Sequence, residues 1–269
     1  MTVDWRTLSW CAPSKDCAVR LNSPSASVLL ADLEQRLLDG RGFSVATLNL
    51  DHLVKFRRLP GFAESYAGMS HVTADGNPVV WLARLAGQRV KLTPGSELVE
   101  PVVEMASRLG VPVGLFGTTD ASLDAAAKAL TRRYPDLRIV ARLSPPMGFD
   151  PAGTEAEAMI ETLFRSGARV VFLALGAPKQ EILASRIARA HPEIGTLSIG
   201  AGLDFLSGAQ NRAPLWVRKL ALEWFWRLMQ SPGRLWRRYR DCFLILPGLT
   251  IATMRLRLSR KSGERGGEA

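Results

Sequence analysis

Short apolar runs and longer stretches with helical spacing alternate along the first 211 residues of the chain. Four apolar runs and one weaker run have the length and β-branched content of buried strands; they are residues 45–49, 111–116, 138–143, 170–175 and 196–199. Helical spacing characterises 25–38, 122–134, 155–166 and 179–190, with Ser25 as a candidate N-cap. Short strands separated by helices favour βαβ units. We therefore expect an α/β fold with a Rossmann-like, mostly parallel sheet flanked by helices.

The pattern changes near Arg212, where charge and aromatic content both rise. Residues 212–261 contain twelve Lys and Arg against two Asp and Glu, and four of the seven Trp, so they carry almost all of the formal net charge of +10. We expect one helix from Pro214 to Gln230, a second over about 234–246, and a third after Pro247 and Gly248. The predicted organisation is an α/β domain over 1–211, a basic amphipathic helical appendage over 212–261, and a disordered tail over 262–269.

Arginine interleaved with tryptophan and aliphatic residues suits the headgroup layer of an anionic membrane. The longest nearly apolar run, 242–254, is interrupted at Pro247 and Gly248 and is shorter than the roughly twenty residues of a spanning helix. A basic surface also fits nucleic acid, or a helical subdomain with a purely structural role. No helix-turn-helix, zinc-finger or RNP pattern is present, so we favour a membrane surface and expect no nucleic-acid partner.

Polar residues gather where the predicted strands end. Thr47 and Asn49 close the first strand, and Asp75 and Gly76 lie in a turn before a helical stretch. Residues 176–181 follow the most apolar strand and open a helix, where glycine and free N–H groups suit an anion. Ligands of open α/β sheets bind at the carboxyl ends of the strands. These positions are therefore candidate site residues, although Asp75 before a glycine also fits a simple turn.

Several familiar motifs are missing from the chain. There is no P-loop pattern, and Gly200 and Gly202 begin a dinucleotide fingerprint in which Phe205 replaces the third glycine. There is no Asp-x-Asp pair, and the histidines at 52, 71 and 191 are dispersed. Three cysteines without metal-type spacing, and an N-terminus unlike a secretory signal, indicate reduced thiols in the cytoplasm. We expect neither a metal nor a cofactor.

Three segments together resemble the WecG/TagA/CpsF glycosyltransferases. They are VFLALGAPKQE at 171–181, IGAGLDFLSG at 199–208 and the basic, aromatic run at 212–239. Upstream, the short motifs ATLN, ADG, TPGSEL and FG follow in the family's order, so the resemblance covers about residues 43–246. The run GAPKQE followed by RAP and LEWxxRL is highly specific to that family.

The resemblance implies an inverting glycosyltransferase of bacterial cell-envelope or exopolysaccharide biosynthesis. Such an enzyme moves a hexosyl or N-acetylhexosaminyl group from a UDP-sugar to a polyprenyl-diphosphate-linked saccharide without a metal. Its expected place is the cytoplasmic face of the inner (plasma) membrane, as a peripheral protein on an anionic surface. The sequence does not determine the oligomeric state, and a homo-oligomer is one of the open alternatives.

The resemblance also assigns roles to residues. Asp75 matches the aspartate proposed as catalytic base, and Thr47 and Asn49 line the same pocket. Gln180 matches a glutamine important for activity. Three tail arginines match residues thought to reach the lipid diphosphate: Arg227, Arg234 and Arg237.

Diphosphate charge needs further partners if no metal is present. Backbone N–H groups near Gly176 and Gly202, together with Lys179, are expected to supply them, and Gly76 adjoins the base. Asp204 is expected either to wall the pocket or to cap a helix.

Two other classes of function remain open at this point. One is a non-catalytic protein that binds anionic lipid through the appendage, which would not require Thr47, Asn49, Asp75 and Gln180 at strand ends. The other is a dinucleotide-dependent oxidoreductase, which the incomplete glycine fingerprint disfavours. We therefore expect the enzyme.

Overall fold

A six-stranded parallel sheet forms the centre of the molecule, which is known from a computed structural model describing residues 2–11 and 19–265. The strand order is β4-β3-β8-β7-β5-β6. The strands are β3 Ser44–Leu48, β4 His71–Ala74, β5 Val113–Gly117, β6 Ile139–Leu143, β7 Val170–Ala174 and β8 Gly195–Ser198. Every pair of neighbouring strands is parallel, so all carboxyl ends lie along one edge of the sheet. The Rossmann-like α/β prediction is confirmed.

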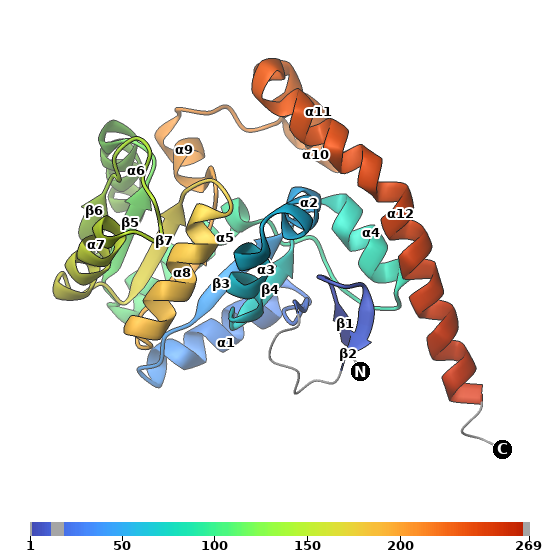
Figure 1. The fold of residues 1–269 in the computed structure, drawn as a ribbon. Coiled ribbons are helices and arrows are strands. Elements are labelled where there is room, and N and C mark those ends of the chain that lie inside the picture. The colour runs from blue at the N-terminus through green and yellow to red at the C-terminus, as the bar shows by residue number, and fades with distance from the viewer. Residues whose placement is uncertain (1, 12–18, 266–269) are drawn as a thin grey trace.

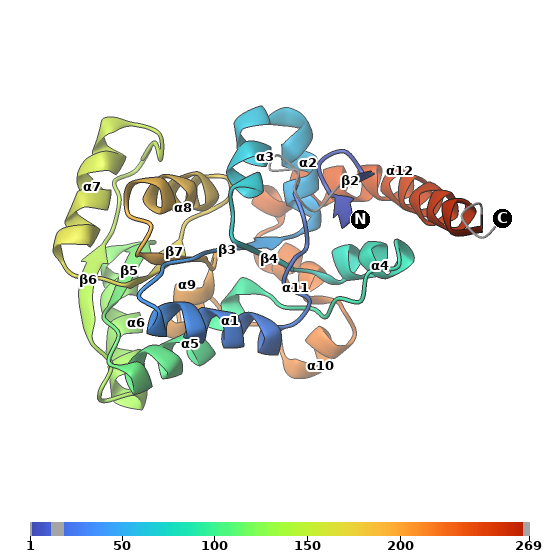
Figure 2. The same ribbon diagram turned by 90° about the horizontal axis from the view of Figure 1, so that it is seen from below.

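Helices cover both faces of this sheet. Figure 2 shows α2, α3, α7 and α8 on one face and α1, α5 and α6 on the other. The helices of the body are α1 Ala26–Leu38, α2 Leu50–Arg58, α3 Pro60–Ala67, α4 Asn77–Leu85, α5 Gly95–Leu109, α6 Asp120–Arg133, α7 Thr154–Arg165, α8 Lys179–Ala190 and α9 Gly202–Ser207. An antiparallel hairpin of β1 (Thr2–Asp4) and β2 (Ser9–Cys11) lies beside them.

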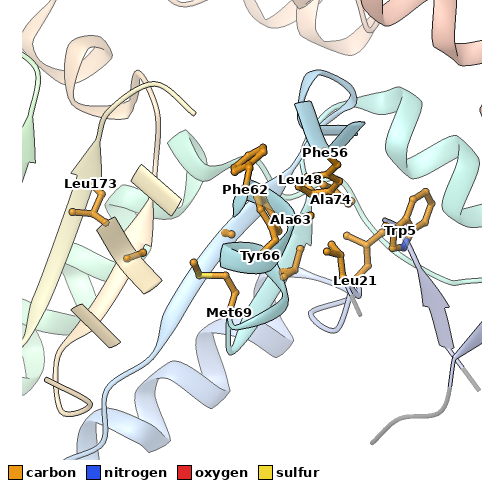
Figure 3. Packing of buried hydrophobic residues seen from close by; sticks show 14 of the residues in the cluster. Trp5, Leu21, Leu48, Phe56, Phe62, Ala63, Tyr66, Met69, Ala74 and Leu173 are labelled. Atoms are coloured by element: carbon orange, nitrogen blue, oxygen red, sulfur yellow. The ribbon is translucent and has the colours of Figure 1, made fainter. Parts of the chain in front are cut away.

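Each face of the sheet has its own buried apolar cluster. On one face, Phe56, Phe62 and Tyr66 pack over Leu48 and Ala74 (Figure 3). The rings of Phe62 and Tyr66 meet edge to face, with centroids 5.3 Å apart. Aromatic pairs with this geometry add stability beyond the area they bury. This cluster therefore packs against one face of the sheet at the carboxyl ends of β3 and β4.

The expected strands and the first expected helices are present, with ends shifted by one or two residues. Ser25 caps α1 as expected, and its hydroxyl accepts a hydrogen bond from the Val28 amide at 3.4 Å. Strand β4 is a difference, because no strand was expected before the turn at Asp75. Its four residues are too few to show a periodic pattern, yet all four are buried beside β3.

The C-terminal region departs more from expectation. The single helix expected from Pro214 to Gln230 is wrong, because α10 (Leu215–Lys219) and α11 (Glu223–Gln230) are separated at Ala221, whose φ is +59°. The expected break at Pro247 and Gly248 is also wrong. Helix α12 is continuous from Pro232 to Arg265 and extends past the body in Figure 1.

Residues 262–265, expected to be disordered, belong to this helix, and 266–269 lie outside the described residues. Proline removes one hydrogen bond from a helix. Pro247 and Gly248 are both exposed, so the carbonyl left unpaired in the preceding turn is on the solvent side of α12. The helix therefore tolerates the proline that the sequence suggested would end it.

Helix α12 has two apolar faces. One packs against α2 and α4, and its Leu235, Leu249 and Leu256 are buried. The other face is exposed and holds six large apolar side chains: Trp236, Phe243, Leu244, Ile251, Met254 and Leu258.

The stretch Leu235–Ser259 of α12 has 25 residues and contains an 18-residue window with a mean hydropathy of 1.3, so by length and composition alone it could cross a membrane. Our expectation that the tail is too short rested on the limited length of the apolar run 242–254 and on a break at Pro247, and the structure does not have that break. Length and composition therefore do not exclude a span. The packing of Leu249 and Leu256 against the body, however, differs from a helix surrounded by lipid.

Candidate active site

The site residues predicted from β3 and β4 lie side by side at the carboxyl edge of the sheet. Thr47 pairs with Thr73 and Leu48 with Ala74, so Asn49 and Asp75 leave the sheet next to each other. The Asp75 amide donates a hydrogen bond of 2.8 Å to the Leu48 carbonyl.

Asp75 occupies the short connection between β4 and α4. The next residue, Gly76, has φ of +94° and precedes the first turn of α4. Glycine adopts this left-handed region without the steric cost that other residues meet. Gly76 therefore lets the chain turn directly from Asp75 into α4, and Asp75 is half-buried at the carboxyl end of β4.

Two neighbours donate hydrogen bonds to the Asp75 carboxylate. The Thr47 hydroxyl is 3.4 Å from Oδ2, and the Asn49 side chain supplies the other bond. Burial raises the pKa of Asp75 to about 6, even though Arg227, Asn49 and Arg238 each favour the charged form. The carboxyl group is therefore ionised at neutral pH with a basicity above that of an ordinary aspartate.

The cations that act on Asp75 come from the C-terminal helices. Arg227 on α11 forms an ion pair with Glu223 at 2.7 Å, and its guanidinium lies 5.5 Å from the centre of the Phe205 ring. Glu223 raises the pKa of Asp75, whereas Arg227 and Arg238 lower it. Charged side chains of α11 and α12 thus act on the ionisation of Asp75.

The other two predicted tail arginines are not brought to the pocket by any described contact. Arg237 is exposed on α12. Arg234 lies in the first turns of α12, and its side chain is outside the described part of the chain. Their predicted roles stay predictions.

Gln180 lies at the start of α8 and bridges two elements. Its Oε1 accepts a hydrogen bond from the Gly200 amide at 3.1 Å, and its Nε2 donates one to Glu181 at 2.8 Å. Glu181 is fully buried, and this burial raises its pKa to about 7 in spite of the bond from Gln180. The amide of Gln180 therefore has a fixed orientation.

Three buried polar groups near Asn49 and Gln180 were not among the predicted site residues. The His52 ring is 2.8 Å from the Tyr66 hydroxyl and 3.3 Å from the amide nitrogen of Asn49. Burial lowers the pKa of His52 to about 3, so it is neutral. Glu181 is the third group. Their helical spacing resembles that of core residues, and only the adjacency of Glu181 to Gln180 pointed towards it.

The loop between β7 and α8 differs in part from expectation. Gly176 is exposed, and the Ala177–Pro178 peptide bond is cis. Lys179 was expected to face the diphosphate, but its ammonium group donates a hydrogen bond of 2.7 Å to the Phe149 carbonyl. A different cation, Lys55 of α2, contacts the loop by donating to the Ala177 carbonyl at 2.8 Å. The sequence did not indicate Lys55.

Asp204 and Gly202 lie at the neighbouring part of the edge. Asp204, in the first turn of α9, accepts hydrogen bonds from Thr118 at 2.6 Å and Gln210 at 2.9 Å. Its carboxylate therefore links the residue that follows β5 to the segment that follows α9. Gly202 is buried, and a Cβ there would lie 3.1 Å from the Val99 side chain, so close packing explains this glycine.

The structure is a parallel α/β sheet with Asp75, Thr47 and Asn49 together at its carboxyl edge, the place where open sheets of this kind usually bind ligands. The profile of the "Glycosyl transferase WecG/TagA/CpsF family" matches residues 15–263. The chain therefore belongs to this family and is a glycosyltransferase. It is similar to the N-acetylglucosaminyldiphosphoundecaprenol N-acetyl-beta-D-mannosaminyltransferase of Bacillus subtilis (strain 168), with 23% identity over 233 residues, 86% of each chain. The family predicted from the sequence is confirmed.

Proposed function

We propose that this enzyme transfers a sugar from a UDP-sugar to a saccharide linked to polyprenyl diphosphate, with inversion at the transferred carbon. The name of the Bacillus relative specifies an acceptor of this type, with N-acetylglucosamine on undecaprenyl diphosphate, and an N-acetylmannosaminyl group as the sugar transferred. An N-acetylhexosamine is accordingly the first donor sugar to test.

Asp75 carries the proposal. An inverting transfer needs one base to take the proton from the acceptor hydroxyl as that oxygen attacks the sugar carbon, and the UDP diphosphate leaves from the opposite side. A carboxylate with a pKa of about 6 is ionised at neutral pH and is a stronger base than an ordinary aspartate. Thr47 and Asn49 orient it through the hydrogen bonds described above.

The departing diphosphate requires positive charge and N–H donors. The exposed backbone at Gly176 and the Arg227 guanidinium are groups at the edge suited to this role. The sequence lacks an Asp-x-Asp pair, so we expect turnover to persist in EDTA. A strict, saturable requirement for added Mg²⁺ or Mn²⁺ would contradict this part of the proposal.

We further propose that the exposed face of α12 rests on the cytoplasmic surface of the plasma membrane. Six large apolar side chains are exposed there, and exposed arginines such as Arg237, Arg240 and Arg255 lie on the same helix. Apolar groups at the acyl boundary and cations near lipid phosphate stabilise such helices. This position would bring the lipid-linked acceptor to the edge that contains Asp75.

The test measures transfer from a panel of UDP-sugars to a polyprenyl-diphosphate-linked N-acetylglucosamine by mass spectrometry, for the wild type and Asp75→Asn. The variant should keep UDP binding in calorimetry and lose roughly 10²–10⁴-fold in turnover, the usual contribution of a positioned base. Asp39→Asn, at the end of α1, is a matched control with expected normal turnover.

Near-normal turnover of a folded Asp75→Asn enzyme would move the base elsewhere, with Asp204 the next candidate. Vesicle binding without turnover on any UDP-sugar would instead contradict the UDP-sugar donor.

A further inference from the structure

Three charged side chains from two helices meet beside the loop between β7 and α8. Oδ2 of Asp51, on α2, is 2.7 Å from the Lys55 ammonium nitrogen and 3.3 Å from Nε of Arg238 on α12. The same ammonium group donates to the Ala177 carbonyl at 2.8 Å. A continuous chain of polar contacts thus runs from α12, through α2, to this loop.

Asp51 is the centre of this cluster. Its side chain is only 10% exposed, and burial by itself would favour the neutral acid. Arg238 and Lys55 nevertheless hold its pKa below the ordinary value, so the group is ionised at neutral pH. A buried carboxylate between two cations has strict geometric requirements, because the loss of any partner leaves a buried charge unpaired.

The two ends of the chain lie in functionally different places. Ala177 precedes Lys179–Ala190, the helix whose Gln180 holds the Gly200 amide. This loop is where we place the donor diphosphate. Arg238 lies on the helix that we place at the membrane, and it also lowers the pKa of Asp75.

We propose that Asp51 is a positioning residue that couples the docking of α12 to the shape of the donor loop. With Arg238 in place, Asp51 fixes the Lys55 ammonium, and Lys55 fixes the Ala177 carbonyl. The donor loop is then in its binding position only while α12 is docked. This inference rests on the proposed function, because it takes the β7–α8 loop as the site of the UDP diphosphate.

A second ion pair between the same two helices provides a matched control. Arg58 of α2 and Asp241 of α12 are 2.8 Å apart, and the Arg58 side chain is 63% exposed. The contacts described for this pair involve α2 and α12 alone. Loss of this pair therefore weakens the contact between α2 and α12 without breaking the link to Ala177 in the β7–α8 loop.

The experiment measures the Kd of UDP by calorimetry on the full chain, with no acceptor and no membrane present. We expect Asp51→Asn and Arg238→Met each to weaken UDP binding about five- to tenfold, although neither side chain is placed against UDP. The double variant should be no weaker than the weaker-binding single variant, because both substitutions break one chain of contacts. Arg238→Lys should recover most of the affinity, and Arg58→Met should leave the Kd unchanged.

A merely structural role would lower Tm for all three ion-pair variants and leave the Kd of UDP unaltered. Unchanged Kd values for Asp51→Asn and Arg238→Met, or losses that multiply in the double variant, would overturn the coupling. If Asp51→Asn does not fold, the comparison of the Kd of UDP between Arg238→Met and Arg58→Met is sufficient to test the coupling. Failure of the wild type to bind UDP would instead overturn the donor assignment, and the coupling with it.

Discussion

Strand β3 and helix α12 are both rich in apolar residues, but they bury them differently. All five residues of β3 are covered by the protein itself. Along α12, Leu249 is 2% exposed on one face, whereas Ile251 is 52% exposed and Leu244 71% exposed on the other. A large exposed apolar face on a soluble protein usually marks an interaction site. The sheet is therefore complete as folded, whereas α12 has one face left for a second contact.

The proposed active site draws on both of these regions. Asp75, Thr47 and Asn49 come from the sheet, but the charges that act on Asp75 come from Arg227 and Arg238 of the C-terminal helices. In the proposed function, the body thus supplies the base, and the C-terminal helices adjust its pKa. The following predictions test how far the two regions depend on each other.

Deletion of all residues after Arg212 should have the largest effect. It removes Arg227 and uncovers the sides of α2 and α4 that Leu249 and Leu256 cover. We expect loss of detectable transfer to a lipid-linked acceptor, weaker vesicle binding and a lower Tm. The assay needs circular dichroism beside it to show that the truncated body is folded. Full activity of a folded truncated enzyme on the native acceptor would show that the body acts without the C-terminal helices.

Matched substitutions on the two faces of α12 should give opposite results. Leu249→Ala creates a cavity against the body and should lower the free energy of unfolding by about 2–5 kcal/mol, measured in urea. Ile251→Ala removes exposed surface and should cost less than about 0.5 kcal/mol. On anionic vesicles the order reverses, and Ile251→Ala should weaken partitioning by about three- to tenfold. Equal effects of both substitutions on stability would show that α12 does not have two distinct faces.

Asp75→Asn should stabilise the fold at neutral pH while it removes activity. The pKa of Asp75 is raised from 3.8 to about 6 in the folded protein, so its ionised form destabilises the fold, and stability is lost as pH rises from about 4 to 6. Because the side chain is half-buried, we expect a gain of about 1–3 kcal/mol at pH 7. Thermal melts should show the gain at pH 7 and almost none at pH 4. A variant less stable than the wild type at pH 7 would show that the carboxylate serves the fold.

The part of the site that follows from strand ends could be predicted from the sequence. Thr47, Asn49 and Asp75 were expected at the carboxyl edge because parallel strands bring their ends together, and Gln180 because it opens a helix after an apolar strand. The structure places all four at that edge.

Contacts between distant segments could not be predicted in this way. His52 and Tyr66 have the spacing of core positions, and the contact of Lys55 with Ala177 joins residues 122 positions apart. Local signals also misled at Pro247, where packing against α2 and α4 outweighs the tendency of proline to end a helix. The polar residues at strand ends could therefore be predicted from the sequence. Their partners on α2, α3 and α12 could be identified only from the three-dimensional structure.

The pH dependence of kcat/KM for the wild type and Arg227→Met tests the central claim most directly, because kcat/KM reports the pKa of the base in the free enzyme. Asp75 must be ionised to act, so the wild-type value should fall tenfold per pH unit below a limb near pH 6. Arg227 lowers the pKa of Asp75, so Arg227→Met should move the limb to higher pH, whatever it does to the maximum. A wild-type limb near pH 4, or a limb that Arg227→Met leaves in place, would contradict a base on the sheet whose pKa is adjusted by the C-terminal helices.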